Sequence, residues 1–133
     1  MEHLNVILVD NNLAFRDALK LLLTKEHNVS IVNVLSNISE LYNERQLFRT
    51  DMIIINFSML DKEDSKIANQ FLIDYPYITI LAISNYTEQN LIKSLYDWGF
   101  AACIDVDNCF AEIAIALENV KKGKIYYSKD FIR

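Results

Sequence analysis

Residues 4–12 read LNVILVDNN, and this stretch decides the fold. Its first six residues form a short apolar run rich in β-branched side chains, which is typical of a strand covered on both faces of a sheet. The next three residues are polar and favour the end of a strand and the cap of a helix: Asp10, Asn11 and Asn12. Apolar residues then recur with helical spacing, so we predict a strand followed by a helix that ends near His27.

The same alternation of apolar run and helical pattern repeats along the chain. The later apolar runs are NVSIVNVL (28–35), MIIINF (52–57), YITILAI (77–83) and AACID (101–105). The residues predicted to cap or end the helices between and after them are Ser36, Pro76, Thr87, Gly99, Asn108 and Gly123. Five strands that alternate with five helices require right-handed crossovers, which place helices on both faces of one parallel sheet. The predicted fold class is therefore α/β, a doubly wound sheet of five parallel strands.

The composition indicates one ordered domain that does not bind nucleic acid by itself. The chain has 133 residues, of which 52% are hydrophobic, and it contains only 2 Gly and 1 Pro. The formal net charge is -5 and the 13 Lys and Arg residues are scattered, whereas a phosphate backbone requires a contiguous positive surface. We interpret the longest basic run, Lys121, Lys122 and Lys124, as the cationic end of a helix.

Metal-binding and membrane-spanning proteins are also disfavoured. Cys103 and Cys109 lack the CxxC spacing and the accompanying histidines of zinc sites, so we expect buried thiols. No stretch approaches the roughly 20 apolar residues that span a bilayer. The first residues, MEHLNVILVD, have neither a basic start nor a small-residue cleavage site. We therefore expect a cytoplasmic protein with no membrane partner.

The binding crevice of a doubly wound sheet lies at the carboxyl ends of its strands. The residues at these ends are Asp10 and Asn11, Asn56, Ser84, and Asp105 with Val106. No GxxxxGK(S/T) or GxGxxG motif occurs, so a glycine-rich backbone that holds nucleotide phosphates is not predicted. The asparagines could line a polar pocket, although asparagines at strand ends more often satisfy neighbouring backbone groups.

In the order of its motifs, the sequence resembles the receiver domains of bacterial response regulators in two-component phosphorelay signal transduction. VILVDNN resembles the first receiver strand with its acidic pair, and DMIIINFSML resembles the third with the phospho-accepting Asp. ILAIS resembles the fourth strand with its Ser or Thr, and GFAACIDV resembles the fifth with its terminal Lys. The resemblance covers nearly the whole chain and implies a flavodoxin-like (βα)5 fold.

The end of the chain, ALENVKKGKIYYSKDFIR, resembles the closing helix and exit segment of receivers that carry a LuxR-type helix-turn-helix output domain. We therefore divide the chain into a receiver-like domain, residues 1–123, and an exit segment, residues 124–133. An output domain is not in this chain, so a lone receiver and a fragment of a transcription regulator both stay open. DNA is expected as a partner only through such an output domain.

The resemblance implies that phosphoryl transfer has lost its essential residues. Receivers take the phosphoryl group onto a carboxylate, with a divalent ion held by that carboxylate and by the acidic pair. The acceptor position is Asn56, whose neutral amide is not a competent nucleophile. The acidic pair is reduced to Asp10 and Asn11, and Asp10 could equally serve to cap the first helix. We expect no acyl phosphate, and weak or absent binding of magnesium.

The other positions implied by the resemblance are only partly preserved. The family's lysine falls at Val106, and a shift of one residue would place Asp105 or Asp107 there, where a carboxylate would repel phosphate. The switch aromatic falls at Cys103. Ser84 matches the switch hydroxyl, although a serine after a buried strand commonly caps the local backbone.

We therefore expect an atypical receiver, or pseudo-receiver, that acts as a phosphorylation-independent interaction or dimerisation module. The candidate surface comprises the fourth predicted helix, the fifth strand and the fifth helix, with a protein partner or a second copy as its occupant. Its aromatic anchors would be Tyr96, Trp98 and Phe100, unless these side chains pack in the core.

Two alternatives are a phosphate-driven regulator and an enzyme. The first would use a substitute acceptor such as Ser58, Asp61 or Ser84. An enzyme would need a catalytic set, but His3 and His27 fall far from the predicted crevice and neither is a convincing base. We therefore predict no catalytic residues.

Overall fold

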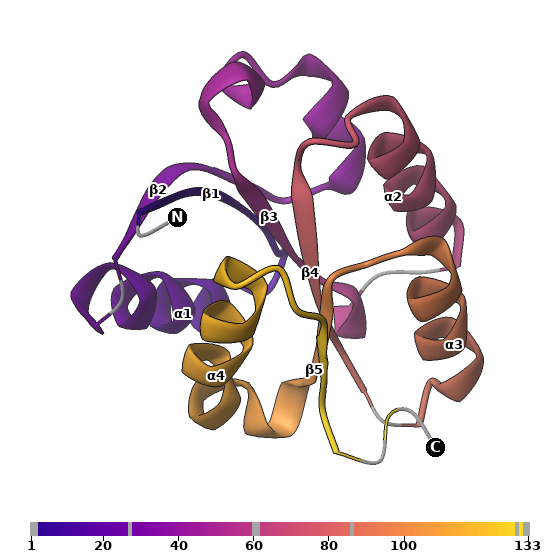
Figure 1. Ribbon diagram of the computed structural model, residues 1–133. Coiled ribbons are helices and arrows are strands. Elements are labelled where there is room, and N and C mark those ends of the chain that lie inside the picture. The colour runs from indigo at the N-terminus through magenta and orange to yellow at the C-terminus, as the bar shows by residue number, and fades with distance from the viewer. Residues whose placement is uncertain (1–2, 27, 60–61, 86, 130, 132–133) are drawn as a thin grey trace.

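Six parallel strands form the central sheet, in the order β2-β1-β3-β4-β5-β6 (Figure 1). The computed structural model describes residues 3–26, 28–59, 62–85, 87–129 and 131. The strands are β1 (Leu4–Val9), β2 (Val29–Leu35), β3 (Met52–Asn56), β4 (Thr79–Ser84), β5 (Ala102–Asp105) and β6 (Tyr126–Tyr127). All of their pairings are parallel, so the predicted fold class is confirmed, with one strand more than expected.

Four α-helices cover the two faces of this sheet. They are α1 (Leu13–Glu26), α2 (Lys62–Asp74), α3 (Gln89–Trp98) and α4 (Cys109–Lys121). Helices α1 and α4 lie on one face, and α2 and α3 lie on the other (Figure 1). No helix in the described part of the chain has both the length and the apolar character needed to cross a bilayer.

The sheet separates two hydrophobic cores, and β3 contributes to both. All five residues of β3 are buried, as predicted for a strand covered on both faces. Ile53 and Ile55 belong to the core that includes Phe71 of α2, whereas Met52 and Ile54 belong to the core that includes Leu19 of α1. Because successive side chains of a strand point to opposite faces, this single apolar run holds both helical layers against the sheet.

The helix predicted after Ser36 is not an α-helix, and this expectation was wrong. Residues Ile38–Asn43 form a 3-10 helix, labelled η1, and the side chain of the preceding Asn37 makes no capping hydrogen bond. Within η1 only Ile38 and Leu41 are buried. A spacing of three residues matches the three residues per turn of a 3-10 helix, so two anchors suffice and no α-helical stripe is required.

The predicted helix ends are confirmed at two glycines, whereas two predicted caps bond differently. Gly99 and Gly123 adopt positive φ angles of 93° and 76°, a conformation that glycine takes without steric cost. The Thr87 hydroxyl does not cap α3, because it donates to the side chain of Asn85 at 3.0 Å. Asn108 stands just before α4, but its side chain makes no capping hydrogen bond.

The segment assigned to an exit from the domain contains β6 and continues the sheet. Tyr126 and Tyr127 pair with Ala102 and Cys103 of β5. Farther along, Phe131 is 3% exposed and belongs to the same core as Phe71. The run of two strand residues is too short to produce a periodic signal in the sequence, which is why β6 was not predicted.

Candidate functional site

The residues singled out at the strand ends lie along the carboxyl edge of the sheet. Asp10 directly follows β1, Asn56 ends β3 and Ser84 ends β4. Val106 follows β5 and begins a short 3-10 turn, η4 (Val106–Asn108). Because β1, β3, β4 and β5 are neighbours in the sheet, these four positions form one row across its edge.

Asp10 and Asn56 form the centre of this row and are in direct contact. Asn56 Nδ2 donates a hydrogen bond to Asp10 Oδ2 at 3.1 Å. Both residues are almost fully buried, with exposed fractions of 3% and 2%. The other carboxylate oxygen of Asp10, Oδ1, accepts from the backbone N–H of Asn12 at 2.8 Å. Asp10 therefore ties the end of β1 both to β3 and to the turn that precedes α1.

The carbonyl oxygen of Asn56 is engaged on its other side. It accepts a hydrogen bond from the backbone N–H of Ser58 at 2.9 Å and another from the Ser58 hydroxyl. The amide is thus fixed between a carboxylate, which it meets with its N–H, and two donors, which it meets with its oxygen. This arrangement agrees with the alternative that asparagines at strand ends satisfy neighbouring groups by hydrogen bonds.

Burial raises the pKa of Asp10 above its usual value of 3.8. The N–H of Asn12, the amide of Asn56 and the positive charge of Arg16 act in the opposite direction and favour the ionised form. Arg16, in the first turns of α1, is a member of the site that sequence reasoning missed. Its position one turn after the helix start was the available signal, because that turn faces the strand ends.

Asn11, the second position of the acidic pair, does not join this cluster. It is exposed, and its side chain makes no hydrogen bond within the described part of the chain. Asn12 instead directly precedes α1, and its Oδ1 accepts from the backbone N–H of Phe15 at 3.1 Å. The helix cap predicted for this stretch is therefore confirmed, with Asn12 as the capping residue.

Ser84 is buried and unpartnered. It has an exposed fraction of 0%, and its Oγ is the one buried side-chain polar atom without a hydrogen-bond partner among the described residues. In the sheet it pairs with Asp105 of β5. The alternative that this hydroxyl caps the local backbone is wrong, because capping would give it a partner.

Acidic and apolar groups occupy the end of β5, where the receiver lysine would lie. Val106 is half-buried and packs against the core beneath α1 and α4. Asp105 Oδ1 accepts from the backbone N–H of Asp107 at 3.1 Å and so caps η4. Close by, the carboxylate of Glu112 accepts from the hydroxyls of Tyr126 at 2.6 Å and Ser128 at 3.1 Å.

The switch aromatic position, Cys103, and the three predicted interface aromatics differ in how deeply they are buried. Cys103 is fully buried, and burial raises the pKa of its thiol. Phe100 is 1% exposed and lies in the core, so it cannot serve as a surface anchor. Trp98 is half-buried against the same core. Tyr96 is 43% exposed and packs edge to face on Tyr127, with ring centroids 5.3 Å apart.

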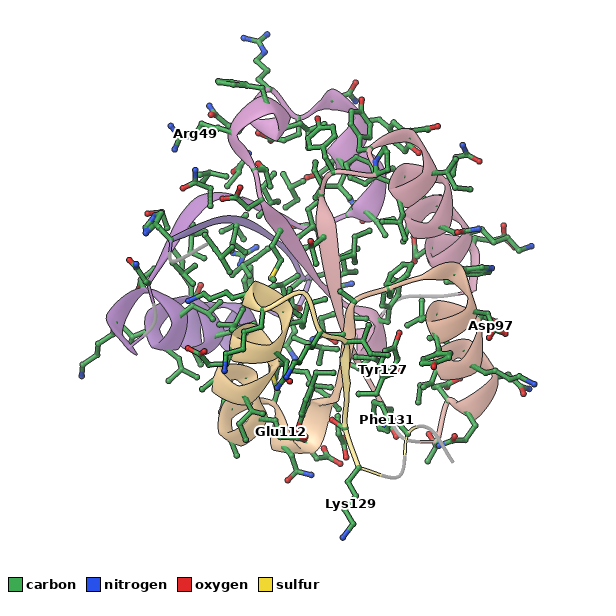
Figure 2. All side chains as sticks on the ribbon, viewed as in Figure 1. Arg49, Asp97, Glu112, Tyr127, Lys129 and Phe131 are labelled. Carbon is green, nitrogen blue, oxygen red and sulfur yellow. The ribbon has the colours of Figure 1, made fainter. Side chains whose placement is uncertain are left out.

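The segment after α4 covers the β5 edge at this surface. Figure 2 shows Glu112 on α4, with Tyr127 and Phe131 on the segment beside β5. The Tyr127 hydroxyl donates to the backbone carbonyl of Phe100 at 2.8 Å. The Ser128 hydroxyl accepts from the backbone N–H of Asp105 at 2.8 Å. A partner that approaches α3, β5 and α4 would therefore meet β6 before it met β5.

Few anionic oxygens stand at the three positions that the resemblance assigns to the metal site. Asp10 is the one carboxylate retained from the three positions, since Asn56 and Asn11 are neutral amides. The described residues contain no group of three or more His, Cys, Asp or Glu side chains placed to hold a metal ion. Magnesium favours several hard anionic oxygens in octahedral geometry, which this set does not supply.

Of the residues named in the two alternatives, Asp61 and His27 lie outside the described residues. Ser58 is half-buried and bonded to Asn56. His3 lies at the amino ends of β1 and β2, away from the carboxyl edge, and its ring contacts the side chains of Asn28 and Ser30, each at 2.8 Å. The geometry therefore leaves His3 without a role at the crevice.

No protein-family model matches this sequence, and no curated protein matches it. Solved structures do share its architecture. The RcsB response regulator of Salmonella typhimurium matches with a TM-score of 0.84 and 17% identity, over 98% of this chain and 66% of that chain. The isolated REC domain of RcsB from Salmonella enterica serovar Typhimurium matches with a TM-score of 0.86 and 16% identity, over 96% and 95% of the two chains.

A LuxR-family two-component response regulator from an Aurantimonas species matches with a TM-score of 0.84 and 15% identity, over 97% of this chain and 92% of that chain. The chain thus spans about two thirds of the longer RcsB chain and nearly all of the isolated receiver domain. Its fold is that of a response-regulator receiver domain, so the structural resemblance predicted from the sequence motifs is confirmed.

Proposed function

We propose that this chain is a receiver-like signalling domain that works as a protein-interaction module without phosphorylation of Asn56. The observation that carries the proposal is the state of the Asn56 amide, which donates to Asp10 and accepts from Ser58. An amide oxygen with two hydrogen bonds is neither charged nor available for attack on a phosphoryl donor. The domain would then act by binding and not by turnover.

Charge supports the same proposal. Phosphoryl transfer to a receiver gathers negative charge that a metal ion and a lysine normally offset. Among the acidic pair and the acceptor position, Asp10 alone offers a carboxylate, and Val106 offers no cation. We infer that magnesium binds weakly or not at all.

The structure gives less support to phosphorylation of a substitute serine than to a module that works without phosphorylation. Ser84 is fully buried, so a kinase could not reach its hydroxyl without opening the end of β4. Ser58 is half-buried and already bonded to Asn56, so its modification would break the contact that holds the amide. We therefore place the phosphate-driven alternative second.

The partner would be a protein or a second copy of this chain. A related structure is described as two RcsB dimers bound to two parallel DNAs, and this chain corresponds to about two thirds of the RcsB chain in that structure. By analogy, any regulation of transcription would come from a DNA-binding domain outside this chain. The candidate surface is still that of α3, β5 and α4, which correspond to the predicted fourth helix, fifth strand and fifth helix. At this surface β6 covers the β5 edge and Tyr96 is the exposed anchor.

Acetyl phosphate or beryllofluoride with magnesium tests the proposal. We expect no mass gain and no shift of the amide resonances of Asp10, Asn56 or Ser84 in the unaltered protein. Asn56→Asp alone should also stay unlabelled, because Asn11 and Val106 still deprive the site of metal and cation. Phosphorylation of the unaltered chain, or rapid labelling of the single variant, would refute the proposal.

A rebuilt site provides the positive control. The triple variant Asn11→Asp, Asn56→Asp and Val106→Lys restores the carboxylate trio and the cation. We expect magnesium-dependent amide shifts with beryllofluoride in this variant only. Light scattering of the unaltered domain then separates the two kinds of partner: a dimer mass that Tyr96→Lys converts to the monomer mass indicates self-association, and a monomer mass indicates a different protein.

A further inference from the structure

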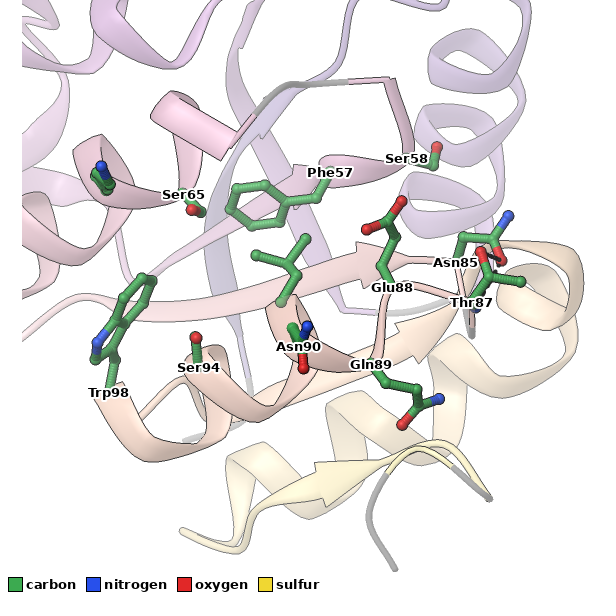
Figure 3. Close-up of a pocket in the computed structure, with 12 residues that line it drawn as sticks. Phe57, Ser58, Ser65, Asn85, Thr87, Glu88, Gln89, Asn90, Ser94 and Trp98 are labelled. Carbon is green, nitrogen blue, oxygen red and sulfur yellow. Dashed lines mark hydrogen bonds between the residues drawn. The ribbon is translucent and has the colours of Figure 1, made fainter.

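A groove of about 750 Å³ runs between α2 and α3, beside the row of strand-end residues (Figure 3). Ser58 and Asn85 stand at one end of it, and Trp98 of α3 stands at the other. Its volume falls within the range of roughly 300–1,000 Å³ that is usual for small-molecule sites.

The groove has an apolar base that suits a ring system. Phe57, Leu91 and Trp98 line it, and the Phe57 ring points into the space between the two helices in Figure 3. Phe57 is buried, whereas Leu91 and Trp98 are half-buried and each keeps part of its apolar surface uncovered. A flat aromatic ligand would cover that surface and stack on the indole of Trp98.

Uncharged polar groups stand beside this base. Asn90 and Ser94, both on α3, line the groove, and their side chains make no hydrogen bond within the described part of the chain. At the end of the groove near Ser58, Asn85 Oδ1 accepts from the backbone N–H and the hydroxyl of Thr87. The amide N–H groups of Asn85 make no hydrogen bond within the described part of the chain. These amide and hydroxyl groups can both donate to and accept from a ligand.

The charges around the groove balance. Among the described lining residues only Lys66 and Glu88 are charged. Lys66 is directed to Glu63, with Nζ and Oε1 3.4 Å apart. An ion in the groove would meet a lining charge of its own sign as well as one of the opposite sign, whereas a neutral ligand has no charge to desolvate.

We propose that the groove between α2 and α3 binds a small, uncharged, ring-containing molecule that carries an amide or hydroxyl group. The inference goes beyond the proposed function and does not depend on it, because the groove lining does not include Asn56. It does give the domain a route for an input other than phosphate. Ser58 contacts both the groove and Asn56, and α3 carries Trp98 toward the groove and Tyr96 toward β6.

Three naphthalene derivatives of similar size test the charge and chemistry of this site. They are 2-naphthamide, which is neutral, 2-naphthoate, which is an anion, and 2-(aminomethyl)naphthalene, which is a cation at pH 7. Trp98 is the single tryptophan of the chain, so its indole N–H resonance reports binding without ambiguity. For a fragment of this size we expect saturation with a dissociation constant of about 0.1–1 mM for the amide. We expect at least fivefold weaker binding of both ions.

Matched substitutions on α3 locate the site. Ser94→Phe fills the groove, whereas Lys93→Phe adds the same ring one residue away, at an exposed position that does not line it. We expect Ser94→Phe to weaken 2-naphthamide at least tenfold and Lys93→Phe to change it less than twofold. If Ser94→Phe fails to fold, Asn90→Phe, at an exposed lining position, serves instead.

Three results would overturn the inference. They are a linear, unsaturated shift of the Trp98 resonance with all three compounds, tighter binding of either ion, and equal binding by the groove-filling and control variants. None of these results depends on acetyl phosphate labelling. Failure of the ligand site and failure of the phosphorylation-independent function are therefore distinguishable.

Discussion

At the scale of single residues, Asp10 and Asn56 form a buried pair of one carboxylate and one amide at the carboxyl edge of the sheet. Two buried carboxylates at this separation would repel one another, and at least one would be driven to bind a proton. With Asn56 the pair carries a single charge, and the amide N–H stabilises that charge at 3.1 Å. The amide therefore lets the two side chains lie in contact without repulsion between two charges.

The raised pKa of Asp10 predicts a pH dependence of stability. A carboxyl group whose pKa is higher in the folded state binds more protons there than in the unfolded chain. Its stabilising contribution is complete below the ordinary pKa of aspartate and is lost as the pH rises through the folded value. Relative to Asp10→Asn, the unaltered protein should therefore lose free energy of unfolding between pH 4 and pH 7. Urea unfolding at several pH values measures this difference, and a difference that grows in favour of Asp10 would contradict it.

Ser84 and Ser128 are both buried serines, but they should respond oppositely to loss of the hydroxyl. Ser84 Oγ has no partner, whereas Ser128 Oγ accepts from Asp105 and donates to Glu112. Removing a buried unsatisfied hydroxyl removes a cost, so Ser84→Ala should change the free energy of unfolding by about 0 to +1 kcal/mol. Ser128→Ala should lower it by about 1–3 kcal/mol, because it leaves a buried N–H and a carboxylate short of a partner. Urea titrations decide, and a loss of about 1 kcal/mol or more in Ser84→Ala would show that this hydroxyl has a partner in solution.

At the scale of elements, β6 pairs with β5 and so replaces it as the edge strand of the sheet. Two strand residues contribute little on their own, so side chains must hold the segment. The Glu112 carboxylate accepts hydrogen bonds from the hydroxyls of Tyr126 and Ser128, and the Phe131 side chain packs in the core. Burial, together with the hydrogen bond to Glu112, raises the pKa of Tyr126 to about 12. The described residues Tyr126, Tyr127, Ser128 and Phe131 are therefore held against the sheet.

Phe131→Ala tests whether β6 is docked in solution. The side chain is almost completely buried, so its truncation should lower the free energy of unfolding by about 3 kcal/mol. Ile125→Ala, in the same segment but 58% exposed, is the matched control and should cost less than about 0.5 kcal/mol. Equal and small effects in urea unfolding would mean that the segment does not pack on the sheet.

At the scale of the whole molecule, one sheet contributes side chains to two separate cores. Ile54 and Ile55 are adjacent in β3, yet Ile54 packs beneath α1 and α4 and Ile55 packs beneath α2 and α3. Loss of either core would leave one face of the same sheet uncovered. The two layers should therefore unfold in a single transition.

Truncation on each side of β3 tests this coupling. Ile54→Ala and Ile55→Ala should each lower the free energy of unfolding by about 2–5 kcal/mol, because both side chains are fully buried. Trp98 fluorescence reports the α2 and α3 layer, and far-ultraviolet circular dichroism reports the whole chain. The two signals should change at the same urea concentration in both variants. Separate midpoints in Ile54→Ala would show that the layers unfold independently.

Much of the architecture was predictable because it is encoded locally. The apolar runs and their polar ends predicted five of the six strands, and Gly99 and Gly123 marked helix ends that the structure confirms. The same local patterns failed at residues 38–43, where only two anchors are buried, and at Tyr126–Tyr127, where the strand is too short. Periodicity reports which side of an element is buried, but it requires several turns or alternations to do so.

The amino-acid sequence by itself determined which chemical groups stand at the carboxyl edge, since an amide at position 56 and an aliphatic side chain at 106 follow from residue identity and strand order. Only the tertiary structure decided how those groups are used. The contact of Asp10 with Asn56 joins residues 46 apart, and the contact of Glu112 with Ser128 joins residues 16 apart. The isolation of Ser84, the nearness of Arg16 and the groove between α2 and α3 likewise depend on several segments at once. Such contacts come from packing between distant parts of the chain, for which no local pattern exists.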